Sequence, residues 1–324
     1  MSAIISSPPV RAGASSSVLT ACLIAALAVV PFVTENRFYL HLGNLVFINL
    51  LLVTGLGIIV KAGQLSLCHA AFAGLGAYAS SLLALHGMPT LLAISGAVAM
   101  CAVAAYFLGK LVLRLRGVYF VLVTFLMGQI FSLLVLDFSE LTRGANGLVN
   151  IPPVSLFGLA LTTPRLFYWF SLAVAVLVSL LAWALLRSSY GRSWSSIEEN
   201  HSLAEASGLD TRRYQGIAFT IGSAIAGLSG ALVAHYVRFI SPDTFTFWET
   251  VGAIVMLVVG GKGSLGGWAL GAAFITPLPE ILRETKELQH ILYGGILIAV
   301  LMFLPSGLVS LVRRLRHAFR GESR

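Results

Sequence analysis

Apolar runs long enough to cross a lipid bilayer recur along the whole chain. A membrane-spanning helix needs about 20 predominantly apolar residues. Only 10% of the 324 residues are charged and 57% are hydrophobic, whereas about a quarter of the residues in a soluble domain are charged. Because so little polar surface is available, the sequence predicts an all-α, polytopic integral membrane protein. The expected spans lie at about 18–34, 39–60, 66–86, 90–113, 117–136, 166–186, 214–236 and 290–311.

The stretch at 247–279 fits two topologies. TVGAIVMLVVG and WALGAAFITPLP are each short for a full crossing, and GGKGSLGG separates them. They form either two tight spans or one re-entrant hairpin. The chain is therefore expected to contain about 8–10 transmembrane helices.

The positions of the basic residues indicate the orientation of the chain. The net charge is +8, and Lys and Arg flank the apolar runs instead of covering a polar domain, which argues against a nucleic-acid partner. Basic residues beside spans mark the cytoplasmic side. We therefore expect a cytoplasmic tail at 1–17, a membrane domain at 18–311 with a cytoplasmic loop at 187–213, and a basic cytoplasmic tail at 312–324.

Sequence patterns that bind cofactors or perform catalysis are lacking. Cys22, Cys68 and Cys101 lie in apolar stretches without metal-ligand spacing. The segment GKGSLG at 261–266 matches a dinucleotide-binding pattern, but it lies between apolar membrane segments. There is also no GxxxxGKS/T loop for ATP and no spacing typical of a nucleophile with its base. We expect this chain to bind no cofactor and to be no enzyme.

Small residues recur at helical spacing in two of the spans. Gly222, Ala226 and Gly230 lie four residues apart in 214–236, and Gly74 belongs to a similar pattern in 66–86. Small residues at this interval let helices approach closely in lipid. This pattern favours helix packing over direct contact with a solute.

Polar side chains at the start of the 66–86 run need partners within the membrane. We expect Gln64 and Ser66 at the cytoplasmic end of this span and His69 one turn deeper. Such groups either bond to neighbouring helices or line a solute pathway. The sequence leaves both alternatives open.

No ionisable residue is expected near the middle of a span. Glu249, Glu280, Asp137 and Lys110 are all expected towards span ends. Carriers driven by protons or sodium commonly place ionisable residues at mid-membrane. A transporter without them needs another source of energy.

The cytoplasmic loop contains a predicted amphipathic helix. In SSIEENHSLAEASGLD, Ser195 and Ser196 are each followed three residues later by a glutamate, which is a capping-box pattern. Gly208 is expected to end this helix. The pattern predicts one short helix over 196–209, and it favours docking of another protein over a solvated connector.

Several ordered stretches of the chain together resemble a known family. These are AGQLSLCHAAFAGLGAY, LRGVYFVLVTFLMGQIFSLL, LTRGANGL, AEASGLDTRRYQGIAFTIGSAIAGLSGALVAHYVRFISPDTFTF, MLVVGGKGSLGGWALGAAF and LPSGLV. They resemble the LivM-type permeases of branched-chain amino acid ABC transporters. The resemblance covers residues from about 40 to 311.

The resemblance implies a permease subunit of an importer in the bacterial inner membrane. Its expected partners are a LivH-like permease, two ATP-binding subunits that hydrolyse ATP, a periplasmic substrate-binding protein and membrane lipid. The loop would contact the ATPase through Ala204, Glu205, Ala206, Gly208 and Leu209. The family's Glu-Ala-Ala-x-x-x-Gly motif is incomplete here, since its glutamate is absent from its slot, and Cys68 replaces a usual glycine.

Other functions share parts of this pattern. Urea and short-chain amide permeases look similar over much of the length, and an ATP-independent secondary carrier or channel is the rival from another class. Under the importer hypothesis, Gln64, Ser66 and His69 are candidate pathway residues. The outer loops would receive the binding protein, with Arg143 and Asp243 as candidate contacts.

Overall fold

The computed structural model describes residues 36–156 and 158–282, together with isolated positions at 29, 31, 294–295, 298, 302 and 307–310. The two expected spans at 18–34 and 290–311 fall almost wholly outside the described residues. The two expected tails, 1–17 and 312–324, lie outside them as well.

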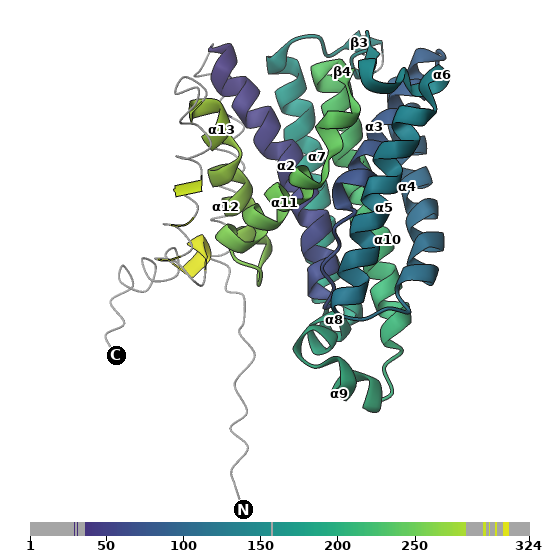
Figure 1. The fold of residues 1–324 in the computed structure, drawn as a ribbon. Coiled ribbons are helices and arrows are strands. Elements are labelled where there is room, and N and C mark those ends of the chain that lie inside the picture. The colour runs from purple at the N-terminus through teal and green to yellow at the C-terminus, as the bar shows by residue number, and fades with distance from the viewer. Residues whose placement is uncertain are drawn as a thin grey trace, which may run out of the picture.

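Long apolar helices make up most of the described chain (Figure 1). Six helical segments in this part are long and apolar enough to cross a membrane, which confirms the all-α, polytopic prediction. One of them is formed by the 3-10 helix η2 together with α11. The other five are α2 (Arg37–Lys61), α4 (Thr90–Val112), α5 (Val118–Asp137), α7 (Pro164–Arg187) and α10 (Thr211–Val237), and α3 (His69–Leu85) is a shorter apolar helix.

Local sequence signals set the ends of several helices. The side chains of Asn36, Thr163 and Asp210 accept hydrogen bonds from backbone N–H groups at the starts of α2, α7 and α10. Pro164 opens α7, where its missing N–H is not needed. The span ends predicted from apolar runs therefore agree closely with the helix ends, apart from α3.

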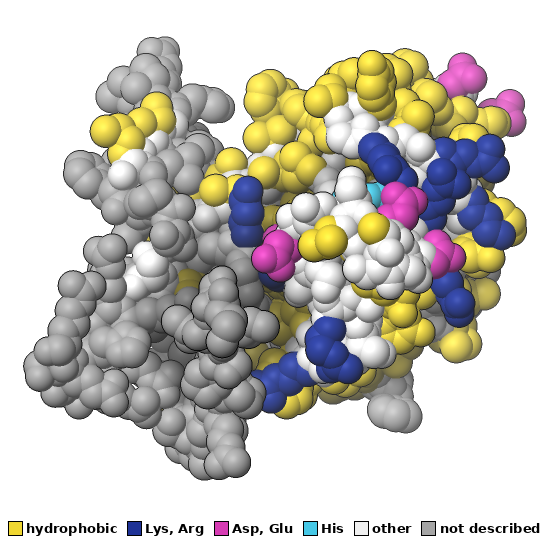
Figure 2. Space-filling view, turned by 90° about the horizontal axis from the view of Figure 1, so that it is seen from below, with side chains coloured by type: hydrophobic (Ala, Val, Ile, Leu, Met, Phe, Trp, Pro, Cys, Tyr) yellow, Lys and Arg dark blue, Asp and Glu magenta, His cyan; other side chains and the backbone are white. Residues whose placement is uncertain are grey.

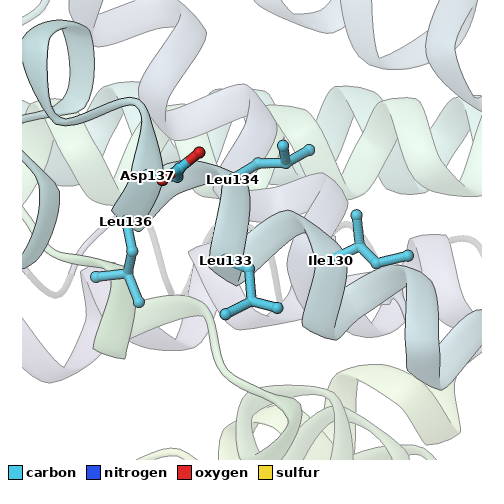
Figure 3. Close-up of a pocket in the computed structure, with 5 residues that line it drawn as sticks. All are labelled: Ile130, Leu133, Leu134, Leu136 and Asp137. Carbon is cyan, nitrogen blue, oxygen red and sulfur yellow. The ribbon is translucent and has the colours of Figure 1, made fainter.

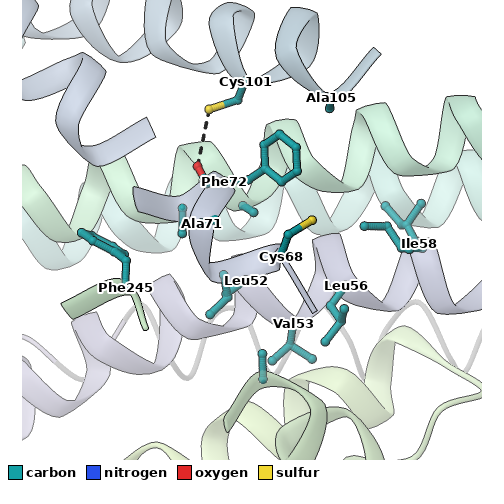
Figure 4. Close-up of a cluster of buried hydrophobic side chains, with 14 of the residues drawn as sticks. Leu52, Val53, Leu56, Ile58, Cys68, Ala71, Phe72, Cys101, Ala105 and Phe245 are labelled. Carbon is teal, nitrogen blue, oxygen red and sulfur yellow. Dashed lines mark hydrogen bonds between the residues drawn. The ribbon is translucent and has the colours of Figure 1, made fainter. Parts of the chain in front are cut away.

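Helix α10 lies at the centre of the bundle and packs against α2, α3 and α4. Glycines bring these helices into backbone contact: a Cβ at Gly76 of α3 would overlap the backbone of Gly227 in α10, and a Cβ at Gly230 would overlap that of Ala73. The surrounding core is apolar, and the thiol of Cys101 on α4 donates to the carbonyl oxygen of Phe72 at 3.5 Å (Figure 4). Such contacts stabilise helix pairs in lipid, where packing replaces the hydrophobic effect.

The two ends of the bundle carry different structures (Figure 1). At one end, two short antiparallel ladders pair β1 (Leu148–Val149) with β4 (Phe239–Ile240), and β2 (Ser155–Leu156) with β3 (Leu159–Ala160). The short helices α6 (Ser139–Thr142) and η1 (Gly144–Asn146) adjoin them. The opposite end carries α8 (Ser189–Glu199) and α9 (His201–Ala206). We call these the strand end and the α8–α9 end.

The stretch at 247–279 forms two arms that pack against each other. After η2 (Pro242–Phe245), α11 (Phe247–Gly260) leads to a turn, and α12 (Leu265–Ile275) and α13 (Pro277–Ile281) return. Trp268 of α12 packs on Gly57, so the turn lies beside the Lys61 half of α2. Each arm is interrupted, at Thr246 and at Thr276, which explains why neither arm reads as a continuous span in the sequence.

The start of the 66–86 span differs from the prediction. Helix α3 begins only at His69, and residues 62–68 are not helical. Thr124 accepts a hydrogen bond from the backbone N–H of Leu67 (3.1 Å), and Thr250 accepts one from Ala70 (2.9 Å). Because neighbouring side chains satisfy its backbone, this segment is tolerated at membrane depth without helical hydrogen bonds.

Candidate functional site

The loop at 187–213 folds as two helices, so the prediction of one helix over 196–209 is wrong. Ser188 caps α8, which places Ser195 and Ser196 inside that helix instead of at a start. Asn200 is extended, and its side chain accepts a hydrogen bond from Leu203 N at 3.0 Å, which ends α8 and starts α9. The strong N-cap preference of asparagine accounts for the break.

Two contacts attach α8 to the bundle, and a third joins α10 to the start of the segment at 62–68. Glu198 forms a salt bridge with Lys61 at the end of α2 (2.8 Å). The indole Nε1 of the buried Trp194 donates to the carbonyl oxygen of Tyr214 in α10 (2.8 Å). Gln215 of α10 donates through Nε2 to the carbonyl oxygen of Ala62 (3.1 Å). The loop thus contacts α2 directly, and it also adjoins the non-helical segment, where a Cβ at Gly63 would lie 3.4 Å from the carbonyl oxygen of Ile197 in α8.

Helix α9 presents an exposed apolar side chain beside an ion pair. Leu203 is 64% exposed, whereas Ala204 is buried. Glu205 accepts two hydrogen bonds from the guanidinium of Arg116, at 3.0 and 3.1 Å. Ala206 and Gly208 are exposed and Leu209 is partly exposed. The positive φ of 86° at Gly208 agrees with the predicted helix stop.

Lys and Arg side chains surround the α8–α9 end. Figure 2 views the molecule from this side and shows basic side chains around a polar surface, with fewer acidic ones among them. This distribution is typical of a membrane-protein face on the cytoplasmic side.

The three candidate pathway residues are buried in protein. His69 is inaccessible to solvent, and its Nε2 donates to the carbonyl oxygen of Leu52 (2.9 Å). Ser66 is also inaccessible, and its Oγ lies 3.2 Å from Sγ of Cys68. Gln64 is 9% exposed. None of the three lines the nearby crevice in this conformation, and their role in a solute pathway stays a prediction.

A narrow crevice lies beside the same segment, where α3, α5 and α11 meet. Its free volume is about 10 Å³, which holds at most one water molecule. The ring of Phe125 contacts that of Phe247 edge to face, with 5.1 Å between centroids. The crevice is therefore closed to solutes in this conformation. Its lining residues are Leu67, Ala70, Ala71, Phe125, Gly128, Gln129, Phe245, Thr246, Phe247 and Thr250.

A larger and more open hollow lies near the strand end of α5. It has a volume of about 410 Å³ and is lined by Ile130, Leu133, Leu134, Leu136 and Asp137 (Figure 3). Four more apolar side chains of α5, those of Val118, Tyr119, Leu122 and Leu126, are also exposed. An exposed apolar helix of this kind faces lipid or another membrane subunit.

The predicted binding-protein contacts lie near the strand end, and the predicted packing residues lie inside the bundle. Arg143 and Asp243 are exposed near the strand end, on segments that flank β1 and β4. Gly74, Gly222 and Gly230 lie at close contacts between elements, and Ala226 is buried in α10. Among the residues that the structure describes, no group of three His, Cys, Asp or Glu side chains is arranged to hold a metal ion.

Sequence reasoning missed two hydroxyl groups and the depth of one carboxylate. Thr124 supports the 62–68 segment and Thr250 supports the start of α3, and an isolated threonine in an apolar run was their only sequence signal. Glu249 precedes Thr250, which bonds to the start of α3. The expectation that Glu249 lies at a span end is wrong, because α11 begins deep inside the bundle.

The arrangement defines a class of protein. Membrane-length helices surround a non-helical segment at membrane depth, and a helical loop at one end attaches to that segment. Interrupted helices of this kind are typical of membrane transport permeases, where they adjoin the solute path.

The chain belongs to the branched-chain amino acid transport system / permease component family, whose model matches residues 38–301. It is 34% identical to the high-affinity branched-chain amino acid transport system permease protein LivM of Escherichia coli K12, over 91% of this chain and 75% of that protein. Identity to LivM of Salmonella typhimurium is 32% over the same shares. An autoinducer 2 import system permease protein, LsrC of Escherichia coli, is 31% identical over 44% of each chain. No solved structure matches the chain significantly.

Proposed function

We propose that this chain is a pathway-forming permease subunit of an ATP-driven importer for leucine, isoleucine and valine. The observation that carries this proposal is the similarity to LivM over 91% of the chain. The importer would combine it with a LivH-like permease, two ATP-binding subunits and a periplasmic binding protein in the bacterial inner membrane. Both termini of the chain would be cytoplasmic, and ATP would be hydrolysed on the separate subunits.

Helix α9 would receive the ATP-binding subunit. It carries the exposed Leu203 on the basic end of the molecule, and Glu205 is held by Arg116. Movement of α9 would reach α8 and then the 62–68 segment through the salt bridge between Lys61 and Glu198. That segment borders the closed crevice through Leu67, so direct contacts would connect the docking surface to the proposed pathway.

The pair formed by Lys61 and Glu198 gives a local test of this link. Their side chains are 18% and 34% exposed, and a salt bridge of this kind contributes about 1 kcal/mol. We expect Lys61→Glu to lower ATP-dependent uptake roughly fivefold. Adding Glu198→Lys, which restores opposite charges, should recover most of the rate. Equal losses in the single and double variants would contradict the link.

The strand end would receive the binding protein. Arg143 and Asp243 are exposed there, at the end of the bundle opposite α9. Solute would then be delivered by the binding protein on one side of the membrane, and ATP would be hydrolysed on the other side.

Uptake by the reconstituted assembly tests the proposed function. Proteoliposomes containing this chain with its partner subunits should accumulate labelled leucine only when ATP and the binding protein are supplied, and excess urea should not compete. Uptake of urea in place of leucine would assign the chain to the urea and amide permeases. Uptake by this chain alone without ATP would identify a secondary carrier or channel.

A further inference from the structure

Glu249 lies near the middle of the membrane-spanning bundle. Leu52 is three residues from the midpoint of α2, or about 5 Å along the helix axis. His69 bonds to Leu52, and the next residue, Ala70, donates to Thr250. Glu249 immediately precedes Thr250 in the first turn of α11.

The side chain of Glu249 is exposed at the surface of the described bundle. No described residue forms a salt bridge or a side-chain hydrogen bond with it. One turn along, a Cβ at Gly252 would meet no atom within 4 Å, so the same side of α11 borders open space. Trp248 beside it is 75% exposed. Glu249 is therefore an exposed residue on a side of α11 that borders open space at mid-membrane depth.

A carboxyl group at this depth is not stable against lipid hydrocarbon. An ionisable side chain near the bilayer centre costs about 2.5 kcal/mol or more, and such groups face a bundle interior or a water-filled cavity. The surface that carries Glu249 is consequently covered by water or by polar groups in the assembled protein. It cannot be part of the lipid-facing surface.

The crevice adjoins the start of α11, where Glu249 lies. Thr246 and Thr250, on either side of Glu249 in the first turn of α11, both line it, and Gln129 of α5 faces them. Three of the ten residues that line the crevice are therefore polar, and two of these three flank Glu249 along the chain.

Building on the proposed function, we propose that Glu249 binds the ammonium group of the transported solute when the crevice between α5 and α11 opens. The ligand class is a small zwitterion with a protonated amine, as in an α-amino acid. Urea and neutral amides carry no positive charge that could pair with this carboxylate. The site therefore favours amino acids over the other solutes that permeases of this length transport.

Uptake by the full assembly tests the role of the charge. Glu249→Gln keeps the shape of the side chain and removes its charge, and we expect ATP-dependent uptake of leucine to fall tenfold or more, since hydrogen bonds to charged groups are the stronger kind. Glu249→Asp should retain part of the rate. Glu280→Gln in α13 is the matched control and should transport normally. Full uptake by Glu249→Gln would overturn the proposal.

Chemical labelling distinguishes a solute pathway from a structural role. We expect Glu249→Cys in the assembly to react with a water-soluble, membrane-impermeant thiol reagent, and leucine should slow the reaction. Leu177→Cys, an exposed position near the middle of α7, is the matched control and should stay unreactive. The unsubstituted chain sets the background, because Cys68 and Cys101 are buried. Equal reaction rates at positions 249 and 177 would overturn the proposal.

The two proposals fail in distinguishable ways. If the unsubstituted assembly takes up no leucine, the proposed function is wrong, whatever the variants show. If it takes up leucine but Glu249→Gln is as active, only the assignment of Glu249 is wrong.

Discussion

Gly76→Ala is expected to lower the free energy of unfolding of this chain by about 3 kcal/mol, at the upper end for overpacked sites. A Cβ at Gly76 would overlap backbone atoms of Gly227 in α10, and backbone cannot move aside as the end of a flexible side chain can. Helices α3 and α10 must therefore separate, which weakens the packing that holds them together in lipid. Thermal unfolding of the purified chain in detergent measures the effect.

Gly266→Ala is the matched control for this change. Gly266 also lies within a helix, α12, but a Cβ there would meet no atom within 4 Å. Alanine favours helix by up to about 1 kcal/mol over glycine, so this variant should unfold at the same temperature or slightly higher. If both variants unfold at the wild-type temperature, the close approach of α3 and α10 is not a major source of stability.

Leu203→Asp is expected to weaken association with the ATP-binding subunits at least thirtyfold. Leu203 is 64% exposed on α9, so the change should leave the membrane bundle folded. A buried apolar anchor at the centre of an interface contributes about 2 kcal/mol or more, which corresponds to this factor. Titrating the purified ATP-binding subunit onto the assembled permeases measures the affinity, and ATP-dependent uptake should fall in parallel.

Ser195→Asp separates a local effect from a general effect of added charge. Ser195 is exposed on α8 in the same loop, but it lies outside the α9 surface. We expect its affinity for the ATP-binding subunit to stay within about twofold of wild type, as for a residue at the rim of an interface. Equal losses from the two aspartates would show that the loop responds to charge and that α9 is not the docking element.

The membrane spans were predictable because the bilayer imposes their length and polarity. The apolar runs at 90–113 and 117–136 correspond to α4 and α5 within a residue or two. The late start of α3 was not predictable, because hydroxyl groups from Thr124 and Thr250, distant in sequence, satisfy the backbone at 67 and 70. An apolar run shows that a segment is buried, but it does not show which partners replace the helical hydrogen bonds.

The candidate site was predicted in part. The loop at 187–213 was located, but its break was missed, because Ser195 with Glu198 imitates a cap while Asn200 provides the actual one. The polar residues Gln64, Ser66 and His69 remain predicted pathway residues, and their neighbours Leu67 and Ala70 line the crevice. Glu249 was placed at a span end because hydropathy does not reveal that α11 begins inside the bundle.

The glycine contacts of α10 also determine which parts of the bundle move together. Helices α2, α3 and α10 meet backbone to backbone at Gly55, Gly76 and Gly230, so they form one stiff block. Helix α5 instead meets α11 through aromatic rings, those of Phe125 and Phe247. Rings can rotate and slide where backbones cannot. A displacement of α8 would therefore move α2, α3 and α10 together as a rigid body. The bundle would separate at the contact between α5 and α11.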